Sequence, residues 1–180
     1  EDAGIPDGLV EAIDFFIVSA TIAGLEAGWN SYNMLAHPSL SRFDHNLVKD
    51  KITTYINGLI KTLADTDNKF YVAKIAELKP VFEEIIKRGS GRATVSFDEV
   101  IETMIDTLPQ RQVFVINSDR KGPSPSLSTS YNFLIGGNSI GRGIAVKNLL
   151  VTYYVRSPRT ARMDTMHQHA RMFGYRQKTL

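Results

Sequence analysis

Cysteine is absent from this 180-residue sequence. Its absence excludes disulfides, thiolate metal sites and cysteine nucleophiles, and it fits a reducing, cytoplasmic location. Long hydrophobic runs are missing too. The nearest approach, residues 12–25, is interrupted by Asp14 and is shorter than the roughly 18 residues that a membrane span requires. We therefore expect neither disulfides nor a membrane segment.

The chain also lacks an initiating methionine and a phosphate-binding loop. It begins with Glu1 and has no basic leader before an apolar segment, so we expect no secretion signal and a chain cut from a longer polypeptide. It has no Gly-x-x-x-x-Gly-Lys-Ser/Thr loop and no acidic pair after a strand, the features that hold ATP with Mg²⁺. The chain alone should therefore not hydrolyse ATP.

Acidic residues are scarce in only one part of the sequence. Residues 1–110 contain 10 Lys and Arg against 17 Asp and Glu, a net charge of −7, whereas residues 111–180 contain 11 against 2, a net charge of +9. The formal charge of +2 at pH 7 hides this asymmetry. A basic segment indicates a polyanionic partner, either nucleic acid or nucleotide phosphates, although a solvated basic face has the same composition.

Apolar residues recur at helical spacing in the first 110 residues. Ser96, with Glu99 three residues later, forms a capping box at the start of the last helical segment. Pro80 lies inside the third segment, which is either continuous or broken there. The spacing predicts helices over residues 8–25, 44–63, 69–87 and 97–108.

Short, continuously apolar or β-branched runs predict strands over residues 33–37, 112–117, 131–135 and 149–155. Pro38 ends the first strand, and residues 120–130 have the composition of a loop. Continuously apolar strands favour a mainly parallel sheet with helices on both faces. Since no internal repeat or second domain boundary is evident, we expect residues 1–180 to form a single α/β unit.

A glycine-rich turn follows the third predicted strand. The sequence Phe133-Leu-Ile-Gly-Gly-Asn-Ser-Ile-Gly-Arg-Gly143 runs from the strand into this turn. Glycines let backbone N–H groups approach an anion, and an arginine pairs with its oxygens. This order of residues indicates a surface that binds phosphate.

Two more arginines follow the last predicted strand, in Asp164-Thr-Met-His-Gln-His-Ala-Arg-Met-Phe-Gly-Tyr-Arg176. Arg171 lies on a predicted helix that should end just before Gly174, so Arg176 could approach the same anion from another angle. An arginine supplied by a neighbouring domain can raise a phosphoryl-transfer rate roughly 10³–10⁵-fold. These arginines are therefore candidates for a role in ATP hydrolysis.

The sequence resembles the Z-one (Z1) domain family in these two blocks and in three further ones. The further blocks are Leu149-Leu-Val-Thr-Tyr-Tyr-Val-Arg156, Met34-Leu-Ala-His-Pro-Ser39 and Val115-Ile-Asn-Ser118. The resemblance spans residues 34–176, and the Phe-Gly-Tyr-Arg block at its end is the most specific part. It implies a RecA-like, three-layer α/β fold. It also implies the second motor lobe of superfamily-2 helicase-like ATPase subunits in bacterial restriction-modification systems, which are often labelled endonucleases.

The resemblance assigns roles residue by residue. Gln168, Arg171 and Arg176 would form the arginine-finger motif, which reaches toward ATP on the other lobe. Gly141, Arg142 and Gly143 would contact that nucleotide. Ala145 departs from the pattern, because the family usually has a hydroxyl residue there, so any role of that side chain is lost or handled elsewhere. The residues placed near the DNA strand would be His37, Ser39, Asn117, Ser118, Asn138 and Ser139.

The expected function is ATP-driven movement along DNA. ATP and Mg²⁺ would be held mainly by a first RecA-like lobe of the same polypeptide, and a nuclease subunit or domain would be a further partner. Two rival functions stay open. One is an endonuclease whose cleavage site lies within this chain, and the other is a non-catalytic DNA-binding or assembly module.

The candidate residues also have structural explanations. Arg171 and Arg176 could pair with local carboxylates such as Asp164 or Asp119, and Arg142 could brace its own turn. Glycines 136, 137, 141 and 143 could serve only as turn residues.

No metal site is expected. His167 and His169 are two residues apart, so on a helix they diverge by about 200° and cannot share an ion. We expect the acidic residues Asp98, Glu99, Glu102 and Asp106 on a solvated helix face rather than in a nuclease site. We expect the aromatic residues Trp29, Tyr153 and Tyr154 in the core rather than on a base-stacking surface.

Overall fold

A computed structural model describes residues 4–38, 42–89, 94–116, 127–136 and 146–154. Its helices and strands all correspond to predicted ones, and their ends agree within two residues; one further element, the short 3₁₀ helix η1, was not predicted. In chain order they are α1 (Asp7–Ala27), β1 (Tyr32–His37), α2 (Arg42–Leu63), α3 (Tyr71–Gly89), α4 (Phe97–Thr107), η1 (Leu108–Gln110), β2 (Gln112–Ile116), β3 (Tyr131–Gly136) and β4 (Leu149–Tyr154).

The four strands form one parallel sheet in the order β2-β3-β1-β4. Every residue of β1 and β3 is buried, so both faces of the sheet centre are covered. This agrees with the continuously apolar sequence of these strands. The prediction of an α/β fold is confirmed, since an all-parallel sheet flanked by helices is consistent with a RecA-like three-layer fold.

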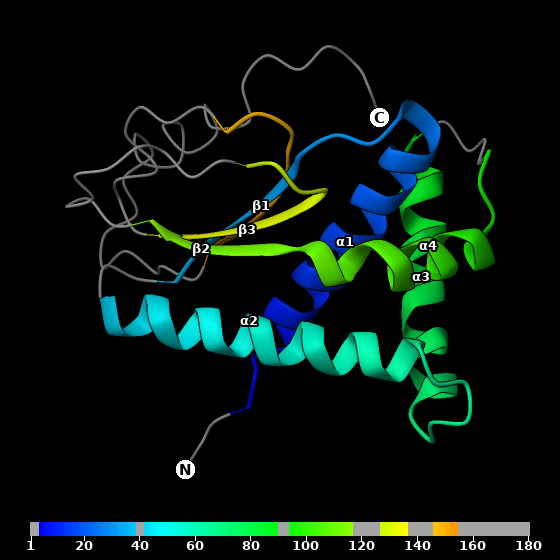
Figure 1. Ribbon diagram of the computed structural model, residues 1–180, viewed down its shortest axis with the longest axis horizontal. Helices are drawn as coiled ribbons and strands as arrows, with labels where there is room; N and C mark the ends of the chain where they lie inside the picture. The colour runs from blue at the N-terminus through cyan, green and yellow to red at the C-terminus, as the bar shows by residue number, and fades with distance from the viewer. Residues whose placement is uncertain (1–3, 39–41, 90–93, 117–126, 137–145, 155–180) are drawn as a thin grey trace.

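Helices α1 to α4 contribute to one hydrophobic core on a single face of the sheet, which we call face A (Figure 1). Side chains alternate between the faces along a strand, and Met34 of β1 and Phe133 of β3 point to face A. The ring of Phe16 in α1 meets that of Phe133 edge-on, with centroids 5.0 Å apart. Helix α1 thus packs directly against the centre of the sheet.

The opposite face, face B, carries a smaller hydrophobic cluster. Leu35 of β1 and Leu134 of β3 point to this side, where Val146 and Leu149 join them. Leu127, which precedes β3, packs against the same cluster. The residues that lead into β3 and β4 therefore lie on the side of the sheet away from the four helices.

Helix α3 continues through Pro80 without a break. Proline removes one N–H donor, which leaves the carbonyl group four residues earlier without its helical partner. Here both Pro80 and Ala76 are exposed, so water can satisfy that carbonyl group. The hydrophobic face of α3 packs through Leu78 and Ile85, on the other side of the helix.

Judged by length and composition alone, α1 is the only helix among the described residues that could cross a membrane. The sequence had been expected to lack such a segment. In the structure 61% of its apolar window is buried, and it provides Leu9, Ile13 and Phe16 to the core. Its apolar composition is thus explained by its position against the sheet.

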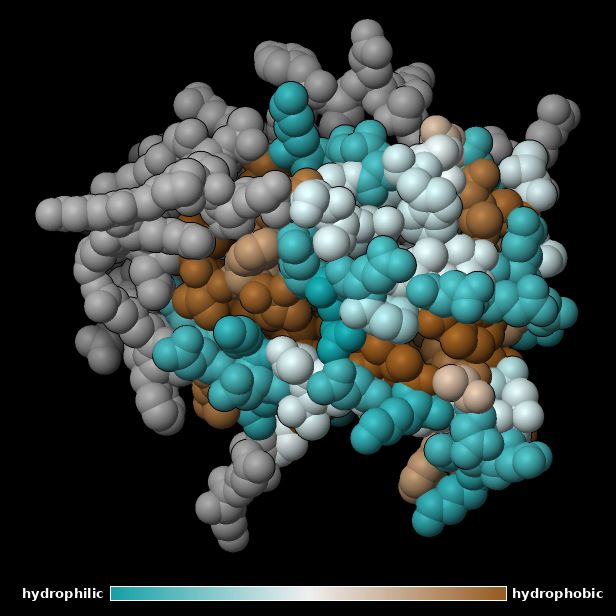
Figure 2. All heavy atoms as spheres, in the orientation of Figure 1, coloured by the Kyte–Doolittle hydropathy of each residue, from teal (hydrophilic) through white to brown (hydrophobic). Residues whose placement is uncertain are grey.

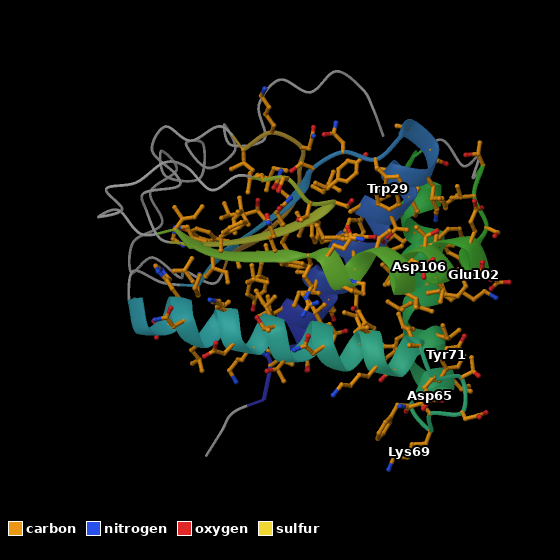
Figure 3. The ribbon with its side chains drawn as sticks, viewed as in Figure 1. Trp29, Asp65, Lys69, Tyr71, Glu102 and Asp106 are labelled. Atoms are coloured by element: carbon orange, nitrogen blue, oxygen red, sulfur yellow. The ribbon has the colours of Figure 1, made fainter. Side chains whose placement is uncertain are left out.

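Trp29, which we expected in the core, is 44% exposed at the end of α1 (Figure 3). Its ring lies over Gly24, where an added Cβ atom would be 2.6 Å from the indole, and it meets Tyr131 at a centroid distance of 6.3 Å. Gly24 thus makes room for the tryptophan on the helix surface.

Gly24→Ala should lower the free energy of unfolding by about 1–2 kcal/mol, because the indole must move off the helix. Trp29 is the only tryptophan, so its fluorescence in a urea titration reports both the displacement and the stability. Gly58→Ala is the matched control, since open space surrounds that helical glycine. This control should stabilise the protein by about 0.5–1 kcal/mol. Equal effects of the two substitutions would contradict the contact.

Candidate functional site

The four parallel strands end at the same edge of the sheet, which we call the carboxyl edge. Their last residues are His37 in β1, Ile116 in β2, Gly136 in β3 and Tyr154 in β4. Ligands of open parallel sheets bind outside this edge, because the strand-to-helix connections there are free to form a site. The carboxyl edge is therefore the first place to look for a functional site.

Described residues close to the central strands pack on both faces of the sheet. After β1 the chain enters α2, whose Ile52 and Ile56 pack on face A. Val146, three residues before β4, packs on face B. Because β1 and β3 are parallel neighbours, their carboxyl ends lie side by side at the centre of this edge. We therefore take the carboxyl ends of these central strands as the candidate position for a ligand.

The predicted site segments begin at this edge. Ser39 follows the end of β1 by two residues, Asn117 directly follows β2, and the glycine-rich segment begins at Gly136, the last residue of β3. The other predicted residues follow in sequence. Apart from His37, all of the predicted site residues lie outside the described residues: Ser39, Asn117, Ser118, Asn138, Ser139, Gly141, Arg142, Gly143, Gln168, Arg171 and Arg176.

His37 is the one predicted site residue that the structure describes. It is fully buried at the end of β1, and its ring centroid is 4.8 Å from that of Tyr154, with 50° between the planes. The two residues are register neighbours across β1 and β4. Tyr154, which we expected in the core, is 38% exposed. Tyr153 points to face A and packs against its core.

The opposite, amino edge of the sheet is bound together by side-chain hydrogen bonds. Asn132 donates to the carbonyl oxygens of Tyr32 and Thr129, at 3.1 and 2.8 Å, and accepts from the Thr129 hydroxyl at 2.9 Å. Asn33 donates to the carbonyl oxygen of Lys147 at 2.6 Å. These bonds connect the segments that lead into β1, β3 and β4. The asparagines at this edge therefore have a structural role.

A buried ionic cluster joins α1, α2 and α3. The Lys74 ammonium group donates to Asp14 Oδ2 at 2.7 Å, to the Tyr55 hydroxyl oxygen at 2.6 Å and to Glu77 Oε2 at 3.0 Å. The Tyr55 hydroxyl donates to Asp14 Oδ1 at 2.6 Å. Burial raises the pKa of the Asp14 carboxyl above its ordinary 3.8, although Lys74 acts in the opposite direction. Burial, and next the Asp14 carboxylate, raise the pKa of Tyr55.

This cluster borders a groove of about 350 Å³ between the helices. Every donor of Lys74 is used within the cluster, and both Asp14 oxygens accept a hydrogen bond. The arrangement links three helices and leaves no donor of the ammonium group for a ligand. We therefore interpret it as a structural clamp rather than a catalytic site.

Figure 2 shows hydrophilic residues along the outward face of α2, beside more apolar surface next to the sheet.

The described residues contain no group of three or more His, Asp or Glu side chains that could hold a metal ion. The acidic residues of α4 are exposed, and Glu102 and Asp106 project from this helix, away from the carboxyl edge (Figure 3). Ser96 caps α4 by accepting a hydrogen bond from the backbone N–H of Glu99 at 3.2 Å, as the capping box predicts. The acidic residues near this cap thus lie on a solvated helix face.

Comparison with known proteins gives one match. A family model described as the Z1 domain covers residues 8–179. No curated protein and no solved structure matches the chain. Since the family model extends over nearly the whole sequence, the chain belongs to the Z1 domain family.

Proposed function

We propose that this chain is the second motor lobe of an ATP-driven DNA translocase in a bacterial restriction system. In this proposal a first lobe of the same polypeptide holds ATP with Mg²⁺, and the present lobe closes on it from the other side of a cleft. The complete protein works in the cytoplasm with DNA and with a nuclease subunit or domain. The association of Z1 domains with endonuclease-type proteins supports a role in DNA processing.

One observation carries this proposal. The segments with the glycines, amides and hydroxyls that the sequence singles out all start at the carboxyl edge, and two of them follow the neighbouring central strands β1 and β3. This is where parallel α/β sheets bind nucleotides and similar ligands. The basic charge of residues 111–180 supports the same conclusion, since DNA and ATP are both polyanions.

The residues of this chain would supply charge and position rather than a nucleophile. Arg171 and Arg176 would stabilise the negative charge that develops on the transferred phosphoryl group, with Gln168 beside them. The turn with Gly141, Arg142 and Gly143 would bind the nucleotide through backbone N–H groups and one guanidinium group. Asn138, Ser139, Ser39, Asn117 and Ser118 would contact the DNA backbone, which fixes register without reading sequence.

ATP with Mg²⁺, when bound, supplies the phosphoryl group whose transfer to water drives the motor. This chain would make only part of the contacts with ATP, because it has arginines and a glycine-rich turn but no phosphate-binding loop. Closure and reopening of the cleft would then move the DNA contacts of the two lobes relative to each other.

An endonuclease centre within this chain is the second candidate, favoured by the association of the family with endonuclease-type proteins. The described residues offer no cluster of acidic or histidine side chains for a metal-dependent cut. A DNA-binding or assembly module without motor activity is the remaining alternative. Salt-dependent DNA binding without ATP hydrolysis by the complete protein would favour that alternative.

A pair of assays separates these functions. The isolated chain, incubated with Mg²⁺, ATP and supercoiled plasmid, should neither nick the plasmid nor release phosphate, because it lacks the phosphate-binding loop. The complete polypeptide should hydrolyse ATP, and DNA should stimulate that rate. Nicking by the isolated chain would instead assign the cleavage site to it. Phosphate release by the isolated chain would contradict the proposal that a separate first lobe holds ATP.

A further inference from the structure

The groove between α1, α2 and α3 has walls that are largely apolar. Val10 of α1, Leu59 of α2 and Phe70, which directly precedes α3, line its volume of about 350 Å³. Phe70 is 59% exposed, and Val72 in the first turn of α3 is 75% exposed. Large apolar side chains that gather on a surface are typical of sites that bind another molecule. The groove is therefore a candidate docking surface.

Gly58 lies in the interior of α2 and lines the same groove. A Cβ atom added to it would have no heavy atom within 4 Å, whereas at Gly24 the ring of Trp29 fills the space. Glycine in a helix interior is less favourable than alanine, because it loses more conformational freedom on folding. No close contact among the described residues requires glycine at position 58. Its effect is to deepen the groove, and the space is open to a group from another molecule.

The groove also has a carboxylate whose charge is only partly neutralised. The Lys74 ammonium group is shared between Asp14 and Glu77, at 2.7 and 3.0 Å. Asp14 is buried in the clamp, whereas the Glu77 side chain is 64% exposed and is bonded, among the described residues, only through Oε2. Lys69 lies at the other end of the groove, with its ammonium group 4.8 Å from the ring centroid of Phe70. Two carboxylates thus share one cation at the Glu77 end.

The groove is too open to enclose a small molecule. A small-molecule site buries about 70–90% of the surface of its ligand. Half of the residues that line this groove are exposed: Thr54, Gly58, Phe70, Ala73 and Glu77. Such a surface suits a side chain or a short segment that a larger partner presents.

We infer that this groove docks a segment of a partner protein in which an apolar side chain stands beside a lysine or arginine. The apolar side chain would lie over Gly58 and against Phe70, and the cation would pair with the Glu77 carboxylate. The excess negative charge at Glu77 favours a basic segment over an acidic one, because like charges repel at an interface. Such docking does not depend on the proposed motor function.

The groove is distant from the carboxyl edge. Figure 3 shows Lys69 and Tyr71, where α3 begins, at the end of α2 opposite to the one that follows β1. A partner in the groove would therefore leave the carboxyl edge accessible.

The probe for the test is a fluorescein-labelled helical peptide with leucines along one face and lysines beside them. Fluorescence anisotropy follows its binding to the complete polypeptide. One control peptide has glutamate in place of each lysine, and another has serine in place of each leucine. Both should bind at least about tenfold more weakly than the probe, because Glu77 repels the first and the second has no apolar side chain for the groove.

Gly58→Leu is the decisive substitution, because it fills the groove without changing any charge. It should weaken binding of the probe at least about tenfold. Leucine is the better helix former, and the added Cβ atom meets no neighbour, so the thermal unfolding temperature should not fall. Gly58→Ala fills less of the space and should weaken binding less.

Glu77→Gln tests the contribution of the carboxylate and should weaken binding of the probe about three- to tenfold. Glu83→Gln is the matched control, because it removes the same charge from an exposed position on another side of α3. Its effect should stay within about twofold.

The docking role is overturned if the probe does not bind, or if Gly58→Leu binds it as tightly as the wild type does. It is overturned as well if Glu77→Gln has no larger effect than Glu83→Gln, since the partner would then not need a cation. Self-association of the wild type that Gly58→Leu abolishes, measured by analytical ultracentrifugation, would instead assign the groove to a second copy of this chain and refute the basic partner segment.

Discussion

Replacing Arg171 by alanine in the complete polypeptide should lower the DNA-stimulated rate of ATP hydrolysis roughly 10³–10⁵-fold, while the fold is kept. The reason is that a guanidinium group from a second lobe neutralises charge that develops only in the transition state. Affinity for ATP should change far less than kcat. The measurement is steady-state phosphate release with saturating DNA, together with a thermal unfolding curve.

Arg88→Ala provides the matched control, since it removes the same charge from α3. Arg88 is exposed and pairs with Glu84 on its own helix, so its loss should leave the rate unchanged. Wild-type turnover in Arg171→Ala would refute the arginine-finger role. A lowered unfolding temperature with an unchanged rate would instead identify a structural ion pair, with Asp164 or Asp119 as the expected partner.

Lys74→Met should produce the largest loss of stability, about 3–5 kcal/mol, because it leaves the Asp14 carboxylate buried without its cation. The two side chains are 11% and 7% exposed, so water cannot replace the lost partner. Urea denaturation at neutral pH measures the difference. Lys79→Met, on the exposed side of α3, is the control. If both substitutions changed the free energy of unfolding by the same small amount, the clamp would be contradicted.

The cost of Lys74→Met should also depend on pH. Burial already raises the pKa of Asp14 in the folded protein above 3.8, and loss of Lys74 should raise it further. The folded state then binds the proton more tightly than the unfolded state does, so stability falls as pH rises above 3.8 toward the raised pKa. The difference between variant and wild type should therefore be smallest below pH 3.8 and largest at neutral pH. A difference independent of pH would contradict this coupling.

Local periodicity was enough to predict the helices and strands. The apolar spacing of α2 and the capping box at Ser96 are local features, and both appear in the structure. The clamp was not predictable, because Asp14 and Lys74 are 60 residues apart and only the packing of α1 against α3 brings them together. The sequence alone shows only that Asp14 interrupts an apolar segment.

The candidate site was predictable in part. The strands of the sheet could be assigned, and with them the edge from which the glycine-rich segment starts. The exposure of Tyr154 could not, since an apolar run does not reveal that β4 is at the edge of the sheet or where its last side chain points. The roles of Arg171, Arg176 and the residues of the glycine-rich turn remain predictions.

The pairing of β1 has a consequence for how the protein is made. Its neighbours β3 and β4 are synthesised roughly 100 residues later, so β1 and the four helices are made before either adjacent strand. Until then Leu35 and the backbone of β1 have no sheet to join, and such strands are prone to aggregate. Truncation before Tyr131 should therefore yield insoluble chains, because the central strand would lack both of its neighbours.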